Sequence, residues 1–141
     1  MLSMNPYLNF SGNTEEAFLF YQSIFGGEFV GGILRFKDVE DGSKLPERDK
    51  NKIMHVRLDI GKGIVLMGTD VLESAGQSLT VGNNITLSIS TETKSEADAL
   101  FLKLSDSGNV QMPLQDTFWG AYFGMFTDKF GIQWMINFDG K

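Results

Sequence analysis

The chain repeats itself once, and this repeat limits its possible folds more than any other feature of the sequence. The segment Gly63–Met67 (GIVLM) recurs as Gly131–Met135 (GIQWM), 68 positions later. In the same way, Glu16-Ala17 recurs as Glu96-Ala97, 80 positions later. The two spacings differ by 12 residues, which is close to the length of a polar segment, 37–51, that only the first half contains. We therefore interpret the chain as two tandem modules, with an insertion in the first one.

The first module begins with a strand and a helix. Apolar and polar residues alternate over 5–10, which predicts a half-buried strand. Apolar residues then recur at helical spacing over 11–27. Asn13 or Thr14 can cap this helix, and Gly26-Gly27 is expected to end it.

Strands make up the rest of the first module. The segment 28–36 is predicted to be a strand with a bend at Gly31-Gly32. The polar segment 37–51 contains glycine and proline and is predicted to be a mobile loop. Two strands over 52–70 form a predicted hairpin around Gly61-Lys62-Gly63, and 71–84 is a plausible linker.

The second module repeats this order. A strand, a helix that stops at Gly108, a short strand interrupted by Pro113 and a closing hairpin are predicted at 84–90, 93–108, 110–117 and 119–138. Both modules therefore read βαβββ, which predicts an α+β fold. Their approximate bounds are 1–72 and 82–141.

Composition excludes several classes of protein. The 141 residues are 42% hydrophobic and 21% charged, as in a globular domain, and the formal net charge is −6. An acidic chain is unsuited to bind nucleic acid or an anionic membrane surface. Cysteine is absent, so the chain has no disulfides and no thiol nucleophile. Neither a signal peptide nor a membrane-spanning run is visible, and we expect a cytoplasmic protein.

Three long segments carry a family resemblance. They are PYLNFSGNTEEAFLFYQSIFGG, KIMHVRLDIGKGIVLMGTD and MPLQDTFWGAYFGMFTDKFGIQWMINF, and the Trp-Gly and Asp-x-Phe-Gly patterns of the last one are specific. Together they closely resemble the PhnB-like branch of the vicinal oxygen chelate superfamily, which has the glyoxalase/bleomycin-resistance/dioxygenase fold. The resemblance covers nearly the whole chain.

The resemblance carries expectations about architecture. It implies a single domain over 1–141, in which curved mixed sheets surround a cup-shaped cavity and the helices lie outside. It also implies a homodimer whose chains complete each other's cavities. Members of this branch often bear a label that names a demethylubiquinone methyltransferase, but no glycine-rich loop for S-adenosylmethionine follows a strand of this sequence.

Metal-dependent relatives imply where metal ligands would lie. Such relatives place histidine, glutamate or glutamine near the start of each module's first strand and in its final strand. In this sequence those places fall near Pro6 or Tyr7, near Asn84 and near Met135, and none of them is a histidine or a carboxylate. His55 is the only histidine of the chain. We therefore expect no catalytic metal and no cofactor.

The strand 53–61 supplies the polar candidates for a site. Histidine exchanges a proton readily near neutral pH, so His55 could be a general base or could donate a hydrogen bond to a ligand. Arg57 could clamp a carboxylate or a phosphate, or it could pair with Asp59. Asp128 lies in a hairpin turn and is interpreted as structural.

Alternation along the strands divides the remaining side chains between two faces. The residues predicted to face the helices are Leu8, Phe10, Ile85, Leu87, Ile89, Ile132, Trp134 and Ile136. Trp119 and Phe123 could stack on a planar ligand. The residues predicted to line a ligand cavity are Tyr7, Asn9, His55, Arg57, Met67, Asn84, Thr86, Trp119, Phe123, Gln133, Met135 and Asn137.

These observations leave three hypotheses for function. The first is a metal-independent protein that binds a small molecule, as antibiotic-sequestering proteins do. The second is an enzyme of the glyoxalase or lyase type, with an unusual metal set or an acid–base pair built on His55. The third is a structural dimer whose cavity is filled.

Overall fold

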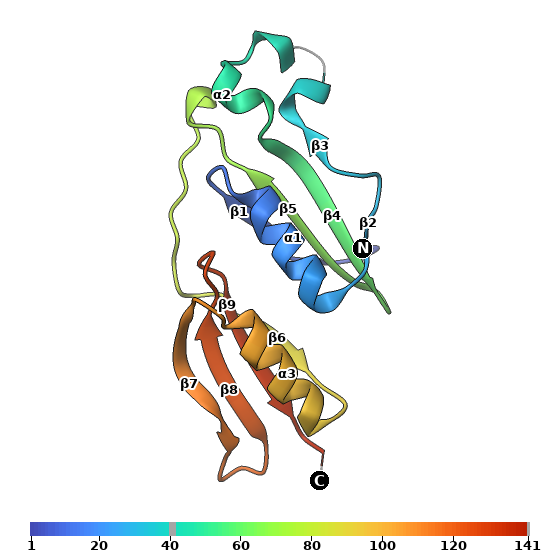
Figure 1. Cartoon of the computed structure of the whole chain (residues 1–141), viewed down its shortest axis with the longest axis vertical. Helices are drawn as coiled ribbons and strands as arrows, with labels where there is room; N and C mark the ends of the chain where they lie inside the picture. The colour runs from blue at the N-terminus through green and yellow to red at the C-terminus, as the bar shows by residue number, and fades with distance from the viewer. Residues whose placement is uncertain (40–41, 141) are drawn as a thin grey trace. The chain divides into compact units, whose positions relative to one another are not determined.

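The computed structural model describes residues 1–39 and 42–140. The chain divides into two compact units, Met1–Thr80 and Val81–Lys141. Each unit contains one open sheet with a long helix lying along it (Figure 1). The predicted α+β class is confirmed.

The first unit has the predicted βαβββ order. Its main elements are β1 (Tyr7–Phe10), α1 (Thr14–Phe25), β2 (Glu28–Phe29), β3 (Leu34–Arg35), β4 (Ile53–Gly61) and β5 (Ile64–Asp70). The strand order is β1-β5-β4-β2, and β3 also pairs with β4. The segment predicted as one bent strand is thus two short strands, separated by a turn at Gly31-Gly32, where both glycines have positive φ.

The second unit has the same topology. Its elements are β6 (Leu87–Ser90), α3 (Lys94–Leu104), β7 (Asn109–Asp116), β8 (Tyr122–Thr127) and β9 (Gln133–Phe138), in the order β6-β9-β8-β7. In both units the first strand runs parallel to the last, and the other pairs are antiparallel. Around Pro113 the register of β7 against β8 shifts, because proline cannot donate a hydrogen bond to the ladder.

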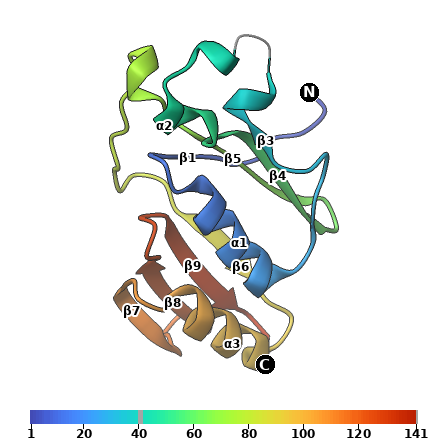
Figure 2. The ribbon, with the colours of Figure 1, turned by 45° about the horizontal axis from the view of Figure 1, so that its top comes forward.

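Helix α1 covers one face of the first sheet (Figure 2). Its buried side chains include Ala17, Phe18 and Tyr21, which are all 0% exposed. Phe18 packs edge-on against Phe10 of β1 and against Tyr21, with ring centroids 6.3 and 5.6 Å apart. The ring also approaches β5 so closely that a Cβ atom on Gly68 would lie 2.5 Å from it. Glycine at this position therefore lets the helix dock on the strand.

The start of α1 is capped by a distant residue. We expected Asn13 or Thr14 to cap the helix, but the side chain of Asn13 makes no capping hydrogen bond. Instead, Oδ1 of Asp70, at the end of β5, accepts hydrogen bonds from the backbone N–H groups of Gly12 and Thr14 and from the Thr14 hydroxyl. Its Oδ2 accepts a fourth bond from the N–H of Ile53. A carboxylate here also suits the positive end of the helix dipole.

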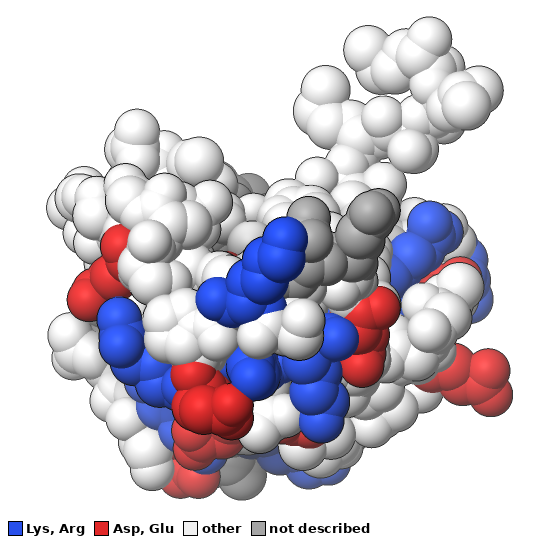
Figure 3. All heavy atoms as spheres, turned by 90° about the horizontal axis from the view of Figure 1, so that it is seen from above, with Lys and Arg blue, Asp and Glu red and all other residues white. Residues whose placement is uncertain are grey.

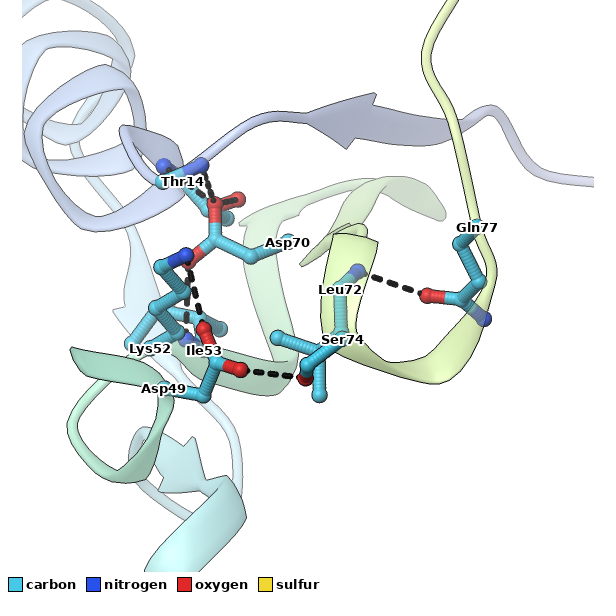
Figure 4. Close-up of polar contacts among 9 residues, drawn as sticks. Thr14, Asp49, Lys52, Ile53, Asp70, Leu72, Ser74 and Gln77 are labelled. Atoms are coloured by element: carbon cyan, nitrogen blue, oxygen red, sulfur yellow. Dashed lines mark hydrogen bonds and ion pairs between the residues drawn. The ribbon is translucent and has the colours of Figure 1, made fainter. Parts of the chain in front are cut away.

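The polar insertion is partly helical, which differs from the mobile loop that we predicted. It contains η1 (Phe36–Asp38), η2 (Gly42–Lys44) and α2 (Glu47–Lys50), while residues 40 and 41 lie outside the described part. Asp49 is 1% exposed, and its carboxylate accepts hydrogen bonds from Lys52 and from Ser74 in η3 (Glu73–Ala75) (Figure 4). These bonds lower the pKa of Asp49. The insertion is thus tied to the segment that follows β5.

The core of the second unit lies between α3 and its sheet. Phe126 and Ile136 are fully buried, and the Phe126 ring packs edge-on against Phe101 of α3 at 4.9 Å. Trp134 is buried on this side, as its parity predicted, and its indole N–H donates to Oδ2 of Asp128. Oδ1 of Asp128 accepts the N–H groups of Phe130 and Ile132, so the turn carboxylate has the structural role that we assigned to it.

The start of the second module was predicted wrongly. Ile85 was expected to face the helix, but it lies before β6 and is 74% exposed. Leu87 and Ile89 pair with Trp134 and Ile136, so they lie on the expected face, although both are only half-buried. The strand begins late because Gly82-Asn83-Asn84 favours a bend.

No helix among residues 1–39 and 42–140 is both long enough and apolar enough to cross a membrane.

Candidate functional site

The face of the first sheet opposite α1 brings several predicted site residues together, and we call it the open face. It carries Tyr7 and Asn9 from β1, His55, Arg57 and Asp59 from β4, and Met67 and Thr69 from β5. The register places Met67 directly between Tyr7 on one side and Arg57 on the other. Opposite side chains of the same strands, including Leu8, Val56 and Leu58, are buried on the helix side. The sequence pattern therefore assigned both faces of this sheet correctly.

Tyr7 and His55 form a hydrogen-bonded pair across the open face. The Tyr7 hydroxyl and Nδ1 of His55 are 2.8 Å apart, and the two rings lie 5.7 Å apart between centroids. Partial burial raises the pKa of the Tyr7 hydroxyl, so the phenol keeps its proton at neutral pH and has an O–H to donate. If this O–H is donated to Nδ1, the imidazole proton lies on Nε2, where it can serve a ligand.

Arg57 lies beside this pair, and its guanidinium has no partner among the residues that the structure describes. Within the described ranges, its guanidinium forms no hydrogen bond and no ion pair, although pairing with Asp59 was one of our alternatives. The carboxylate of Asp59 instead accepts the N–H of Gly61, at 2.9 Å. Arg57 itself is exposed. A guanidinium of this kind can hold a planar oxygen acid through two parallel hydrogen bonds.

Arg35 shows the contrasting arrangement in the same unit. Its guanidinium donates to both carboxylate oxygens of Glu15, at 3.1 and 2.7 Å, and also to the carbonyl of Asn51. The hydrogen bonds from Arg35 lower the pKa of Glu15, and those to Glu15 raise the pKa of Arg35. This arginine fastens β3 to the first turn of α1, so it is structural.

In the second unit the predicted residues follow the same pattern on the sheet face opposite α3. Phe123 pairs with Asn137 and Met125 with Met135, and Gln133 pairs with Thr127 at the end of the same hairpin. The amide of Gln133 is partly used, because its Nε2 donates to the carbonyl of Ile85. All of these side chains are half-buried.

Asn84 and Thr86 lie ahead of the strand on which we expected them. Both precede β6, and Asn84 is an exposed residue of a bend. Tyr7 pairs with Met67, whereas it is Ser88 that pairs with Met135, the repeat counterpart of Met67. The position equivalent to Tyr7 in the second module is therefore Ser88. The count along the sequence failed because the strand begins later than the alternating pattern.

An exposed aromatic tip accompanies the second sheet. Trp119 is 56% exposed, and its ring packs edge-on against Phe123 with the ring centroids 6.0 Å apart. Phe118, which we did not single out, is 98% exposed and packs edge-on against Trp119. The sequence feature that could have pointed to Phe118 is its position next to Trp119 and Gly120, after the predicted strand 110–117. In the structure, hydrogen bonds between Thr117 and Ala121 close the loop that contains Phe118.

The residues at the family's metal-ligand places do not fit a divalent cation. The structure places a phenol (Tyr7) beside a thioether (Met67) in the first unit, and a hydroxyl (Ser88) beside a thioether (Met135) in the second. Divalent cations in proteins are bound mainly by carboxylate and imidazole side chains instead. In the part of the chain that the structure describes, no three histidine, aspartate or glutamate side chains are grouped as a metal site.

Comparison with known proteins agrees with this architecture. A family model described as 3-demethylubiquinone-9 3-methyltransferase matches residues 3–137. Protein YjdN of Escherichia coli (strain K12) is 31% identical over 96% of this chain and 95% of its own. The crystal structure of protein PA1353 from Pseudomonas aeruginosa is 40% identical over the full length of both chains, with a TM-score of 0.86.

Two further structures share this fold. A putative 3-demethylubiquinone-9 3-methyltransferase, PhnB protein, from Bacillus cereus is 27% identical over 96% of this chain and 98% of that one, with a TM-score of 0.77. A glyoxalase/bleomycin resistance protein/dioxygenase family enzyme from Burkholderia phytofirmans PsJN covers 95% of this chain and 97% of its own. It shares the fold alone, at 18% identity and a TM-score of 0.64. The chain belongs to the PhnB-like family, whose model bears the 3-demethylubiquinone-9 3-methyltransferase description, and it has the fold of glyoxalase/bleomycin resistance/dioxygenase proteins.

Proposed function

We propose that this protein binds a small molecule on the open face of its first sheet, without a catalytic metal. The observation that carries the proposal is the hydrogen bond between Tyr7 and His55 beside an arginine with no protein partner among the described residues. Binding sites typically combine an apolar surface with a few polar groups that fix orientation. Here Met67 supplies the apolar surface, and Tyr7, His55 and Arg57 supply the polar groups.

The second unit supports the same proposal through aromatic and amide side chains. Trp119 and Phe123 offer aromatic faces, and Gln133 and Asn137 offer amides on β9, the strand that pairs with that of Phe123. Such a surface suits a planar ligand, since stacked aromatic pairs are favourable beyond their buried area. We include this surface, with Met135, in the proposed ligand-binding set.

The methyltransferase activity in the family's description is not part of the proposal. A methyltransferase must bind S-adenosylmethionine, and the turns between a strand and a helix are common places for such a cofactor. In the first unit, the donors of that turn are already bound by Asp70. In the second, Thr93 caps α3 by accepting the N–H of Glu96, whose side chain accepts the N–H of Glu92.

A thermal-shift screen of a small-molecule library against the purified protein tests the proposal. A ligand that binds the native state raises the melting temperature by mass action. We expect hits whose shift disappears in the variants His55→Ala and Tyr7→Phe, while the variants themselves still unfold cooperatively. Compounds whose melting-temperature shift is the same in both variants as in the unchanged protein would contradict the proposed site. An absence of stabilising compounds would favour the structural dimer with a filled cavity.

Metal analysis of the same preparation separates binding from lyase chemistry of the usual kind. We expect no stoichiometric metal, because Tyr7, Ser88 and the two methionines are poor ligands for it. Stoichiometric metal that is lost in His55→Ala would instead support an enzyme of the glyoxalase type.

For partners and compartment, we propose a cytoplasmic homodimer that binds neither nucleic acid nor membranes. The net charge of −6 supports the part of this proposal that concerns nucleic acid and membranes, since nucleic acid and anionic membrane surfaces would repel an acidic chain. Basic and acidic side chains also lie intermixed on the end of the first unit that carries α2, seen from above in Figure 3.

A further inference from the structure

We infer that the ligand of the open face is an organic monoanion, whose single carboxylate is bound by Arg57. The inference rests on the proposed function, because it specifies the ligand of the same site. It depends on three features of the open face: the uncommitted guanidinium, the donors and apolar surface beside it, and the carboxylates that lie one step further along the sheet.

The three arginines of the chain differ in the hydrogen bonds and ion pairs that their side chains form. Arg35 is bound to Glu15 and to the carbonyl of Asn51. Arg48 lies in α2, a turn that also contains two acidic residues and a lysine. Arg57 projects from the middle of β4 among side chains of the open face and has no partner in the described ranges. A charged hydrogen bond donor in this setting is available to a ligand oxygen acid.

The neighbours of Arg57 fit the rest of such a ligand. Adjacent strands lie about 4.8 Å apart, so Arg57 and Tyr7, which flank Met67 on either side, are roughly 10 Å apart at the backbone. A small aromatic or branched acid bound to Arg57 can therefore cover Met67 and reach the Tyr7–His55 pair. There, if the Tyr7 hydroxyl donates to Nδ1, the Nε2–H of His55 can donate a second hydrogen bond to an oxygen of the ligand.

Two carboxylates near Arg57 disfavour a second negative charge on the ligand. Glu28 and Asp59 pair directly across β2 and β4, and Asp59 shares the face of Arg57 two residues along the strand. Like charges in opposed positions repel each other and any further anion. A second acidic group on the ligand would therefore be disfavoured at that end of the site.

The experiment is an NMR titration of the full chain with three matched probes: benzoate, its neutral amide benzamide, and the dianion isophthalate. The signals to follow are the His55 imidazole and the Nε–H of Arg57. We expect benzoate to shift both signals, and benzamide to bind at least about tenfold more weakly, because a hydrogen bond between charged groups contributes that much. Isophthalate should also bind more weakly than benzoate, and Glu28→Gln should reduce that difference.

Variants at two arginines provide the matched control. Arg57→Gln should weaken benzoate binding at least about tenfold. Arg48→Gln makes the same change in net charge away from the open face, and it should leave binding unchanged.

Several results would overturn the inference. These are equal binding of benzoate and benzamide, unchanged binding in Arg57→Gln, and no shift of either signal up to the solubility limit of benzoate. A neutral compound whose binding depends on Tyr7 and His55, but not on Arg57, would contradict the inference that the ligand is an anion. It would still agree with the proposed function. Loss of binding for every compound tested would remove the proposed function itself.

Discussion

Asp70, the last residue of β5, connects three segments of the first unit through one buried carboxylate. It is 2% exposed and accepts four hydrogen bonds, at 2.6 to 3.1 Å, from Gly12, Thr14 and Ile53. These donors lie at the start of α1 and at the start of β4 (Figure 4). Each would lose its partner inside the protein if the carboxylate were removed.

We predict that Asp70→Ala lowers the free energy of unfolding by about 3–5 kcal/mol, since buried polar groups left without partners are costly. Urea unfolding monitored by circular dichroism measures this change. Asp106→Ala removes an exposed carboxylate and should change the free energy by less than about 0.5 kcal/mol. A loss below about 1 kcal/mol in Asp70→Ala would show that water replaces the carboxylate.

Tyr122 offers a second test at the level of a single residue. Its hydroxyl donates to Asp98, and this hydrogen bond is the main cause that raises its pKa to about 12. The protonated phenol is therefore favoured in the folded state, and its contribution to stability is complete below pH 10. That contribution is lost as the pH rises from the unfolded pKa through 12.

Ultraviolet titration of the phenolate should show one tyrosine that ionises near pH 12 and is missing in Tyr122→Phe. Asp98→Asn should move this ionisation toward the ordinary tyrosine value, because it removes the negative charge that the phenolate would face. An unchanged titration in Asp98→Asn would mean that the hydrogen bond does not form in solution.

At the level of elements, the docking of α1 on its sheet depends on a large residue on the helix and a glycine on the strand. Phe18 is fully buried between Phe10 and Tyr21, and Gly68 lies beneath its ring. A Cβ atom at residue 68 would lie 2.5 Å from one ring carbon and 2.9 Å from another. The surrounding rings leave Phe18 little room to move away.

We therefore predict that Gly68→Ala destabilises the protein by about 1–3 kcal/mol through overpacking. Gly82→Ala is the matched control, because its added Cβ would have only the side-chain oxygen of Asn84 nearby, at 3.7 Å. Thermal unfolding of both variants measures the difference. Equal melting temperatures would show that α1 shifts on the sheet without cost.

The sequence was most informative about elements and least informative about contacts between distant segments. The repeat predicted both βαβββ modules, since a strand hairpin such as 52–70 is encoded locally by alternation and a glycine turn. The capping of α1 by Asp70 joins residues 56 positions apart, which no local pattern records. The contact of Asp49 in the insertion with Ser74 was missed for the same reason, because the two residues are 25 positions apart.

For the candidate site, too, the sequence predicted some features and not others. Faces of β1, β4 and β5 were predicted, so Tyr7, His55, Arg57 and Met67 fell together as expected. Asn84 and Thr86 lie before β6, because the start of a strand is set by where pairing begins and not by where alternation begins. Whether Arg57 pairs with Asp59 was beyond the sequence, since both residues lie on one face and only geometry separates the alternatives.

On the scale of the whole molecule, each unit exposes features that a second copy of the chain can cover. The first sheet ends in β1 and the second in β6, and edge strands expose unpaired backbone groups. The side chains of Phe118 and Trp119 are also largely exposed. We predict a homodimer in sedimentation at micromolar concentration, and Phe118→Ser with Trp119→Ser should weaken it if this aromatic tip is part of the interface. A monomer at that concentration would contradict the prediction.

The most direct test of the account follows the single histidine of the chain by nitrogen NMR. Because only His55 contributes imidazole signals, ¹⁵N-histidine labelling reports on the open face without assignment of other residues. We predict a change of the imidazole signals in Tyr7→Phe, because the hydrogen bond to Nδ1 is lost, and a shift of the signals with every ligand that stabilises the protein. Stabilising ligands that leave the His55 signals unmoved would contradict the claim that the open face of the first sheet is the binding site.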